Sequence, residues 1–404
     1  MSRRPQRPPP PDLDRTIECR HFGTCGGCSV LDQPIRWQLH DKVAACERVL
    51  RPFLGDVRIE CPEPTWTPRF FRTRLLFPVR ADKSRLPIVG IYGFRSHDLV
   101  RIEDCQTMDR WLTAFGFAAE RVLREHRVRP FEPSSGNGMV KAIWARLASG
   151  AGQVLAGVVT QPGAFEPGPQ IAKDLQKAAA ELPRADKERR LVGVVHSISD
   201  RDDDFLLGDR HVPLLGQDHV VERAGDLTFR VSAGSFWQIH ADADRLLYRP
   251  AMQMCGDVRG KKVVDGYGGV GPFGLRLAHA GAAHVTIVEE GPSACRDAEH
   301  NATRNGLTNV DVIAAPFAST PLPKHVDLVV VDPPRSGLGS KAIGRVLAAG
   351  PSRVLYVSCV AESLAQDLGE LCANGYRVAA IRLADLFPHT EHVELLVMLE
   401  RTAA

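Results

Sequence analysis

The chain has 404 residues, of which 44% are hydrophobic and 25% charged, with a formal net charge of +3. This length exceeds what one hydrophobic core normally supports, so we expect two or three domains. No apolar run is long enough to cross a bilayer, and the N-terminal residues carry no apolar secretion signal. We therefore expect a cytoplasmic protein without a membrane span, while the small net charge decides nothing about a nucleic-acid partner.

Ten cysteines occur in the chain. Without a secretion signal, they argue against a disulfide framework and favour reduced thiols that bind metal or perform chemistry. Half of them stand alone in apolar or helical contexts and are interpreted as packing residues. These five are Cys46, Cys61, Cys255, Cys295 and Cys372.

A cysteine cluster follows a proline-rich, basic arm that covers residues 1–16. Cys19, Cys25 and Cys28 form a C-x5-C-G-G-C pattern, whose glycines let the backbone turn tightly around a group held by sulfur. Three thiolates leave a four-coordinate site one ligand short, and Cys105, at the end of a strand-like run, is the best fourth candidate. Four thiolates fit either an iron-sulfur cluster or a structural zinc, and their spacing does not choose between them.

The sequence before residue 236 predicts two regions. The first, over residues 17–110, contains the cysteine cluster and strands suited to RNA, and the second, over 111–235, is a central α+β domain. In the first, basic and aromatic residues alternate between positions 69 and 101, which suits binding of phosphates and bases. The same pattern suits any sheet with one solvated face. Apolar periodicity predicts helices over 33–54, 107–127 and 169–182, and strands over 138–160 and 191–231.

From about residue 240 the pattern alternates between strand and helix, which indicates a parallel sheet with helices on both faces. We expect an α/β fold, with a Rossmann-like domain over residues 236–404. Its strands are predicted at 262–265, 286–289, 310–313, 327–331 and 354–358.

The first of these strands leads into a glycine-rich turn that suits a nucleoside cofactor. Asp265 precedes Gly268, Gly269 and Gly271, where a ligand can approach bare backbone, and Glu289 ends the next strand, where it can accept hydrogen bonds from a ribose. A dinucleotide turn requires G-x-G-x-x-G directly after the strand. The order D-G-Y-G-G-V-G instead favours S-adenosylmethionine.

The fourth strand ends in Asp332-Pro333-Pro334-Arg335. Two consecutive prolines stiffen the chain and hold Asp332 beside the same crevice. Many methyltransferases that modify amino groups carry an aromatic residue where Arg335 stands, so this motif directs attention to methylation of carbon.

Methylation of pyrimidine carbon 5 requires a nucleophile at carbon 6 and a base for the carbon 5 proton. Cys359 fits the first role, because it follows a buried strand and precedes a helix whose N-terminus favours a thiolate. Glu394, at the start of an apolar C-terminal strand, fits the second, since burial would raise its pKa. Nearby alternatives for the base are Glu391, His389 and His392.

Together these motifs resemble the RNA uridine-5 methyltransferase family, which forms 5-methyluridine in ribosomal or transfer RNA. The resemblance runs from about residue 17 to the C-terminus and includes S-F-W-Q at 235–238 and F-P-H-T-E-H-V-E at 387–394. It implies Cys359 as nucleophile, Glu394 as base and a target uridine flipped out of its stack. It implies S-adenosylmethionine contacts from Gln238, Tyr267, Glu289 and Asp332. It also implies a 4Fe-4S cluster on Cys19, Cys25, Cys28 and Cys105.

The sequence departs from the family at several positions. Relatives usually have Cys at the position of Gly268, Asn or Thr at Pro272, and Asn-Pro in place of Val360-Ala361. Some begin with a small β-barrel that binds RNA, and we expect none here because only eighteen residues precede Cys19. We expect a monomer acting on ribosomal rather than transfer RNA.

Two other interpretations stay open. An RNA cytosine-5 methyltransferase would carry a further cysteine beside Asp332, which this chain lacks. An inactive iron-sulfur or zinc protein that only binds RNA would have lost S-adenosylmethionine binding, and the retention of Cys359 and Glu394 argues against it.

Overall fold

A computed structural model describes residues 15–61, 68–183, 188–201 and 207–402. The predicted arm over 1–16 lies outside these residues except for its last two. The helices are α1 (Ile35–Leu54), α2 (Arg110–Glu125), α3 (Gly168–Ala180), α4 (Arg249–Cys255), α5 (Gly274–His279), α6 (Pro292–Arg304), α7 (Gly339–Ala349) and α8 (Ala361–Ala373), with short helical turns η1 (Asp244–Tyr248) and η2 (Phe317–Ser319). None of these described helices is both long and apolar enough to span a membrane.

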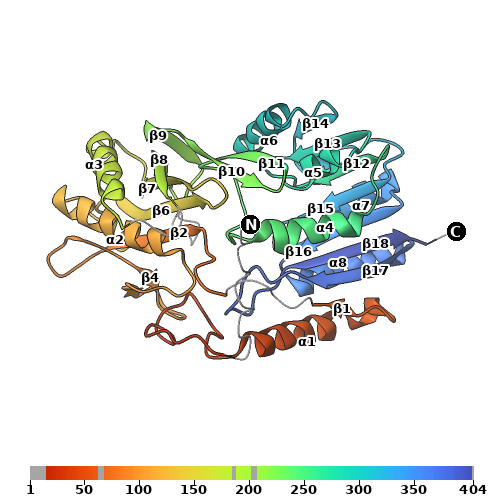
Figure 1. The fold of residues 1–404 in the computed structure, drawn as a ribbon, viewed down its shortest axis with the longest axis horizontal. Helices are drawn as coiled ribbons and strands as arrows, with labels where there is room; N and C mark the ends of the chain where they lie inside the picture. The colour runs from red at the N-terminus through yellow and green to blue at the C-terminus, as the bar shows by residue number, and fades with distance from the viewer. Residues whose placement is uncertain (1–14, 62–67, 184–187, 202–206, 403–404) are drawn as a thin grey trace, which may run out of the picture.

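The strands form two large sheets and two hairpins (Figure 1). They are β1 (Ile59–Glu60), β2 (Arg74–Ala81), β3 (Pro87–Val89), β4 (Ile91–Tyr92), β5 (Leu99–Val100), β6 (Val140–Ala148), β7 (Gln153–Thr160), β8 (Arg190–Ile198), β9 (Arg210–Gly216), β10 (His219–Ala224), β11 (Leu227–Ser232), β12 (Lys262–Gly266), β13 (His284–Glu289), β14 (Val310–Ala314), β15 (Leu328–Val331), β16 (Arg353–Ser358), β17 (Tyr376–Leu383) and β18 (Leu395–Arg401).

The C-terminal sheet has the order β1-β17-β18-β16-β15-β12-β13-β14. Its pairs are parallel except those of β18, which runs antiparallel to β16 and β17. Consecutive residues of β12 face opposite ways: Val263 packs in the core under α4, α5 and α6, and Val264 in the core under α1, α7 and α8. A largely parallel sheet covered on both faces confirms the Rossmann-like α/β fold predicted for this part of the chain.

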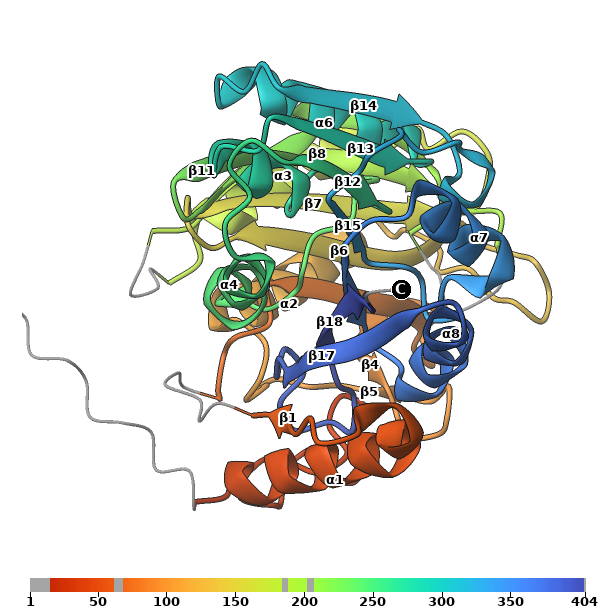
Figure 2. The same cartoon turned by 90° about the vertical axis from the view of Figure 1, so that its right-hand side faces the viewer.

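Helix α1 and strand β1 belong to this C-terminal unit in space, although they lie far away in sequence. β1 pairs with β17 in parallel, and Ile59 faces Ile381. Leu39 and Leu50 of α1 join the same buried cluster as Leu364 of α8. Figure 2 shows α1 below the C-terminal strands. The predicted 17–110 region therefore contributes to two different units.

The second sheet has the order β3-β2-β6-β7-β8-β9. Its strands β7 and β8 are parallel and are connected through α3, a crossover that needs a helix because parallel strands cannot be joined by a tight turn. Leu75 of β2 lies opposite Ala145 of β6. One sheet thus takes strands from both sides of the boundary predicted at residue 110, and α2 and α3 cover one of its faces.

The hairpin of β10 and β11 joins the two units. Trp144 and Leu155, on the other face of the six-stranded sheet, share one buried cluster with Phe229 of β11 and with Val263 and Leu355 of the C-terminal sheet. This continuous apolar core fixes the two sheets relative to each other, which places segments from both units around the same clefts.

Candidate active site

The strand register places Cys359 next to Glu394. β16 and β18 are antiparallel, with Ser358 opposite Leu395. Cys359 follows Ser358 and Glu394 precedes Leu395, so the two residues occupy the next position of the same register. Helix α8 begins at Ala361. This geometry confirms the predicted strand-to-helix junction at Cys359 and brings the predicted nucleophile and base to one edge of the sheet.

The surroundings of Cys359 raise the pKa of its thiol. Burial contributes most, followed by the carboxyl of Glu394, while Arg335 acts in the opposite direction. We predicted that the helix N-terminus would favour the thiolate. In the absence of substrate, burial and neighbouring carboxyls outweigh that effect, so the resting group is a thiol.

Glu394 is the buried carboxyl of this site, with 3% of its surface exposed. Burial raises its pKa well above the usual range, and the nearby Asp332 raises it further. Burial likewise raises the pKa of Asp332. Two carboxyls that share one desolvated site resist being ionised together, so a carboxylate there takes up a proton more readily than one in water. Among the described residues the Glu394 carboxyl has no hydrogen-bond partner, which leaves it available to a substrate.

The three alternative bases are less suited to proton removal next to Cys359. Glu391 and His392 are exposed. The His389 ring is buried, and its Nε2 lies 2.7 Å from the carbonyl oxygen of Pro68. His389 is therefore engaged in holding the chain, and Glu394 remains the candidate base.

The glycine-rich turn lies at the carboxyl edge of the same sheet, where parallel α/β sheets bind ligands. Tyr267 has a φ of 59°, an unfavourable left-handed conformation for a residue with a side chain, and its ring packs 5.3 Å from that of Phe317. Both carboxylate oxygens of Glu289 accept backbone N-H groups, from Gly269 at 2.9 Å and Gly291 at 2.7 Å. These bonds fix the orientation of Glu289 at the strand end.

Of the two remaining predicted cofactor contacts, Asp332 lies at this edge and Gln238 lies in a loop before the sheet. Asp332 directly follows β15, the neighbour of β12 in the sheet. Gln238 is buried, in the segment between β11 and η1. The strand order thus gathers side chains from widely separated parts of the sequence.

The departure at Gly268 has a physical reason in this chain. A Cβ atom at that position would stand 2.6 Å from Cγ2 of Ile287 and 3.1 Å from the Asp265 carboxylate. Glycine is therefore required beside this isoleucine. At the start of α8, Val360 supplies no side-chain cap, and Ser363 Oγ instead donates to its carbonyl at 3.2 Å.

Helix α1 holds the loop that leads to Glu394, a role that we did not predict from the sequence. Lys42 Nζ lies 2.6 Å from Asp385 and donates to the Phe387 carbonyl at 2.9 Å. Gln38 accepts the His389 backbone N-H at 2.8 Å. Gln38 and Lys42 are polar residues four apart on the apolar face of a helix, and that pattern was the available signal.

The four cysteines of the predicted cluster line one small cavity between the 19–28 segment and the 102–108 segment. Burial, and then the neighbouring Cys105, raises the pKa of Cys28 to about 12. The backbone N-H of Gly27 points to Cys25 Sγ at 3.3 Å, and that of Met108 to Cys105 Sγ at 3.3 Å. In the described part of the chain, no three Cys, His, Asp or Glu side chains are arranged to hold a single metal ion.

The proteins that this chain resembles in sequence are RNA methyltransferases. Residues 323–402 match the model of the family described as tRNA (Uracil-5-)-methyltransferase, and residues 226–355 match the Methyltransferase small domain. An uncharacterized RNA methyltransferase of Clostridium acetobutylicum is 30% identical over 400 residues, covering 96% of this chain and 84% of that protein. One of Caldanaerobacter subterraneus subsp. tengcongensis is 30% identical over 402 residues, covering 95% and 84%.

A solved structure has a similar fold. The tRNA (uracil-54, C5)-methyltransferase of Pyrococcus abyssi, in complex with S-adenosyl-L-homocysteine, superposes with a TM-score of 0.71 at 25% identity, over 92% of this chain and 85% of that one. Fold and site thus define an S-adenosylmethionine-dependent RNA methyltransferase. More specifically, the chain belongs to the RNA uracil-5 methyltransferase family.

Proposed function

We propose that the protein methylates carbon 5 of a uridine in RNA through a covalent bond to Cys359. The observation that carries this proposal is the strand register, which sets the Cys359 thiol beside the buried carboxyl of Glu394. A thiol without a nearby base would support a packing role instead. The cytoplasm is the proposed location and a monomer the proposed form.

The reaction divides into addition, methylation and elimination. The Cys359 thiol gives its proton to solvent water and its sulfur bonds to uracil carbon 6, so the ring electrons move to carbon 5 and oxygen 4. S-adenosylmethionine, when bound, would supply an electrophilic methyl group and leave as S-adenosylhomocysteine once its sulfur-methyl bond breaks. The electron pair at carbon 5 forms the new carbon-carbon bond. Glu394 then accepts the carbon 5 proton, the 5,6 double bond returns, and the carbon-sulfur bond breaks.

The electrostatics of the site suit this order of reaction steps. Glu394 and Asp332 share a desolvated site, so a carboxylate there has a strong tendency to take up a proton. Arg335 favours the Cys359 thiolate as it forms. S-adenosylmethionine would be held by Tyr267, Glu289 and Asp332, which lie along the same edge of the sheet, and by Gln238 from the buried segment between β11 and η1.

The four-cysteine cavity is proposed to hold a 4Fe-4S cluster. Four thiols facing one cavity are the donor set of such a cluster and also of zinc. Backbone N-H groups already point at the sulfurs of Cys25 and Cys105, and hydrogen bonds to sulfur are a common feature around iron-sulfur clusters. These N-H groups support the cluster, and metal analysis distinguishes it from zinc.

Nucleoside mass spectrometry tests the proposed reaction. Ribosomal and transfer RNA from a strain lacking the protein are compared with RNA from its parent. We expect loss of 5-methyluridine from one RNA class, with ribosomal RNA predicted from the sequence and transfer RNA named for the Pyrococcus protein. Return of the nucleoside on complementation assigns the activity, and unchanged 5-methyluridine in both classes would contradict the proposal.

A further inference from the structure

A cavity of about 740 Å³ lies where the six-stranded sheet meets the β10-β11 hairpin and helix α6. It adjoins the cofactor edge without including it. Its lining residues Phe236 and Gly291 stand two positions from Gln238 and Glu289, respectively. A ligand in this cavity would therefore lie beside the segments that carry two of the proposed cofactor contacts.

Two arginines face each other across adjacent strands at the base of this cavity. Arg74 of β2 is the register partner of Arg146 of β6. Like charges directly opposite each other destabilise a sheet. Burial, and then Arg74, lowers the pKa of Arg146 to about 9, and burial lowers that of Arg74 to about 10. Arg146 donates to the carbonyls of Ser232 at 2.7 Å and Ser235 at 2.6 Å, so part of its hydrogen-bonding capacity is used.

The acidic residues of the cavity offset this charge only in part, since Asp297 favours the charged form of Arg146 but is bonded to another arginine. Asp297 and Asp218 both bind Arg230, at 3.1 and 3.2 Å. Asp209 is at the exposed rim. Among the described residues, the side chains of three lining arginines have neither a hydrogen-bond nor an ion-pair partner. They are Arg74, Arg210 and Arg296.

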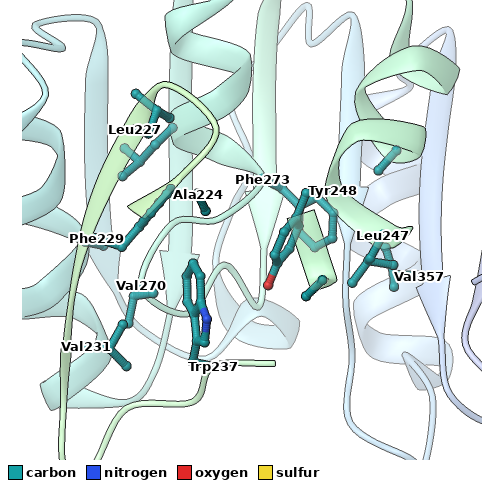
Figure 3. Close-up of a cluster of buried hydrophobic side chains, with 14 of the residues drawn as sticks. Ala224, Leu227, Phe229, Val231, Trp237, Leu247, Tyr248, Val270, Phe273 and Val357 are labelled. Carbon is teal, nitrogen blue, oxygen red and sulfur yellow. The ribbon is translucent and has the colours of Figure 1, made fainter. Parts of the chain in front are cut away.

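An exposed aromatic ring borders the same cavity. The Phe236 residue is 60% exposed. The next residue, Trp237, is buried, and its ring centroid lies 5.1 Å from that of Phe229 and 5.9 Å from that of Tyr248. Figure 3 shows the Trp237 ring between these two rings. Trp237 thus anchors the segment and keeps Phe236 at the surface. Unpaired guanidinium groups beside an accessible ring are suited to a phosphate and a base of single-stranded RNA.

We propose that this cavity binds a nucleotide of the RNA strand that flanks the target uridine, with its phosphate on Arg74, Arg210 and Arg296 and its base against Phe236. This inference rests on the proposed function, because it assumes an RNA substrate. It explains why two arginines face each other across a strand pair: the phosphate carries the charge that opposes them.

The test is binding of a fluorescent 12-nucleotide oligouridylate to the full chain over a series of KCl concentrations. The double variant Arg210→Ala/Arg296→Ala changes exposed side chains only. We expect it to bind about tenfold more weakly. The slope of log affinity against log salt should fall by about 0.7 for each phosphate of a single strand that the variant no longer neutralises.

The matched control is Arg304→Ala, on the same helix as Arg296 and outside the cavity lining. It should leave both affinity and slope unchanged. A double variant that behaves like the control would overturn the proposal. Stabilisation by inorganic phosphate that depends on Arg210 and Arg296, with oligouridylate binding unchanged, would show a free-anion site and also overturn it. Comparison of 5-methyluridine in RNA from the deletion strain and its parent separates this outcome from failure of the proposed function, which would leave that nucleoside unchanged.

Discussion

Cys359 and the four cysteines of the N-terminal cavity resemble each other as single residues. Each is partly buried, and burial raises the pKa of Cys359 as it does those of Cys25 and Cys28. Their neighbours differ. Cys359 has carboxyls and an arginine nearby, whereas Cys28 has other thiols. Neighbouring groups, rather than burial or local sequence, therefore decide whether a thiol suits proton-coupled addition or binding of a metal group.

The largest effect is expected at Cys359. Replacing it with Ala removes the nucleophile and should lower methylation by roughly 10⁴-fold or more, while binding of S-adenosylmethionine is unchanged. Single-turnover assays with labelled methyl donor measure the rate. The matched control is Cys372→Ala, a partly buried cysteine on α8, which should retain activity. Equal turnover by both variants would show that Cys359 is a packing cysteine like Cys372 and not the nucleophile.

Replacing a cysteine of the N-terminal cavity should change the metal content of the protein. Replacing Cys28 with Ser removes one of four thiol ligands, so we expect loss of most iron and sulfide from anaerobically purified protein. Metal analysis and visible absorption measure this, and Cys372→Ser should keep the parent content. One equivalent of zinc with no iron in the parent protein would refute the cluster.

A substitution at Lys42 tests how the loop before Glu394 is held next to the cysteine segment. The backbone N-H groups of Ser29 and Val30, next to the cysteine segment, donate to the His389 carbonyl at 3.0 and 3.2 Å. Lys42 holds the same loop through Asp385, and both side chains are buried. Lys42→Met leaves a buried carboxylate unpaired and should lower the free energy of unfolding by about 3–5 kcal/mol.

Urea denaturation measures that change. The double variant Lys42→Met/Asp385→Leu removes both charges and should recover most of the stability, since an apolar pair of similar size often replaces a buried ion pair without loss. If the single variant is as stable as the parent, the ion pair does not hold the loop before Glu394.

The smallest predicted effect is on pH dependence. The pKa of the Cys359 thiol is raised, so its thiolate fraction at neutral pH is small and grows about tenfold with each pH unit below that pKa. The raised pKa of Glu394 also makes the rate increase with pH, because only its carboxylate form can accept the carbon 5 proton and that form becomes more abundant as pH rises. Single-turnover rates should therefore rise from pH 7 to 9 at saturating substrates. A plateau below pH 8 would mean that substrate binding, rather than bulk pH, sets the thiolate fraction.

Much of the C-terminal unit could be predicted from sequence, because its strands are continuous apolar runs that end in chemically distinctive residues such as Asp332 and Cys359. The packing of α1 against α8 could not be predicted, because the sequence of a helix shows which of its faces is apolar but not which element covers that face. The six-stranded sheet crosses the boundary predicted at residue 110 for a similar reason, since strand partners distant in sequence leave no local signal. The opposed pair of Arg74 and Arg146 depends on the register of β2 and β6, so it could not be predicted from the sequence either.

The most direct test of the central claim uses Glu394→Gln, which should slow removal of the carbon 5 proton by about 10²- to 10⁴-fold and so accumulate the covalent intermediate. The variant is incubated with S-adenosylmethionine and RNA, digested with nuclease and protease, and mapped by mass spectrometry, with Glu391→Gln as the matched control. We expect a methylated uridine nucleotide bonded to the peptide containing Cys359 and none in the control. An adduct on another cysteine, or methylation at the parent rate without an adduct, would contradict the central claim.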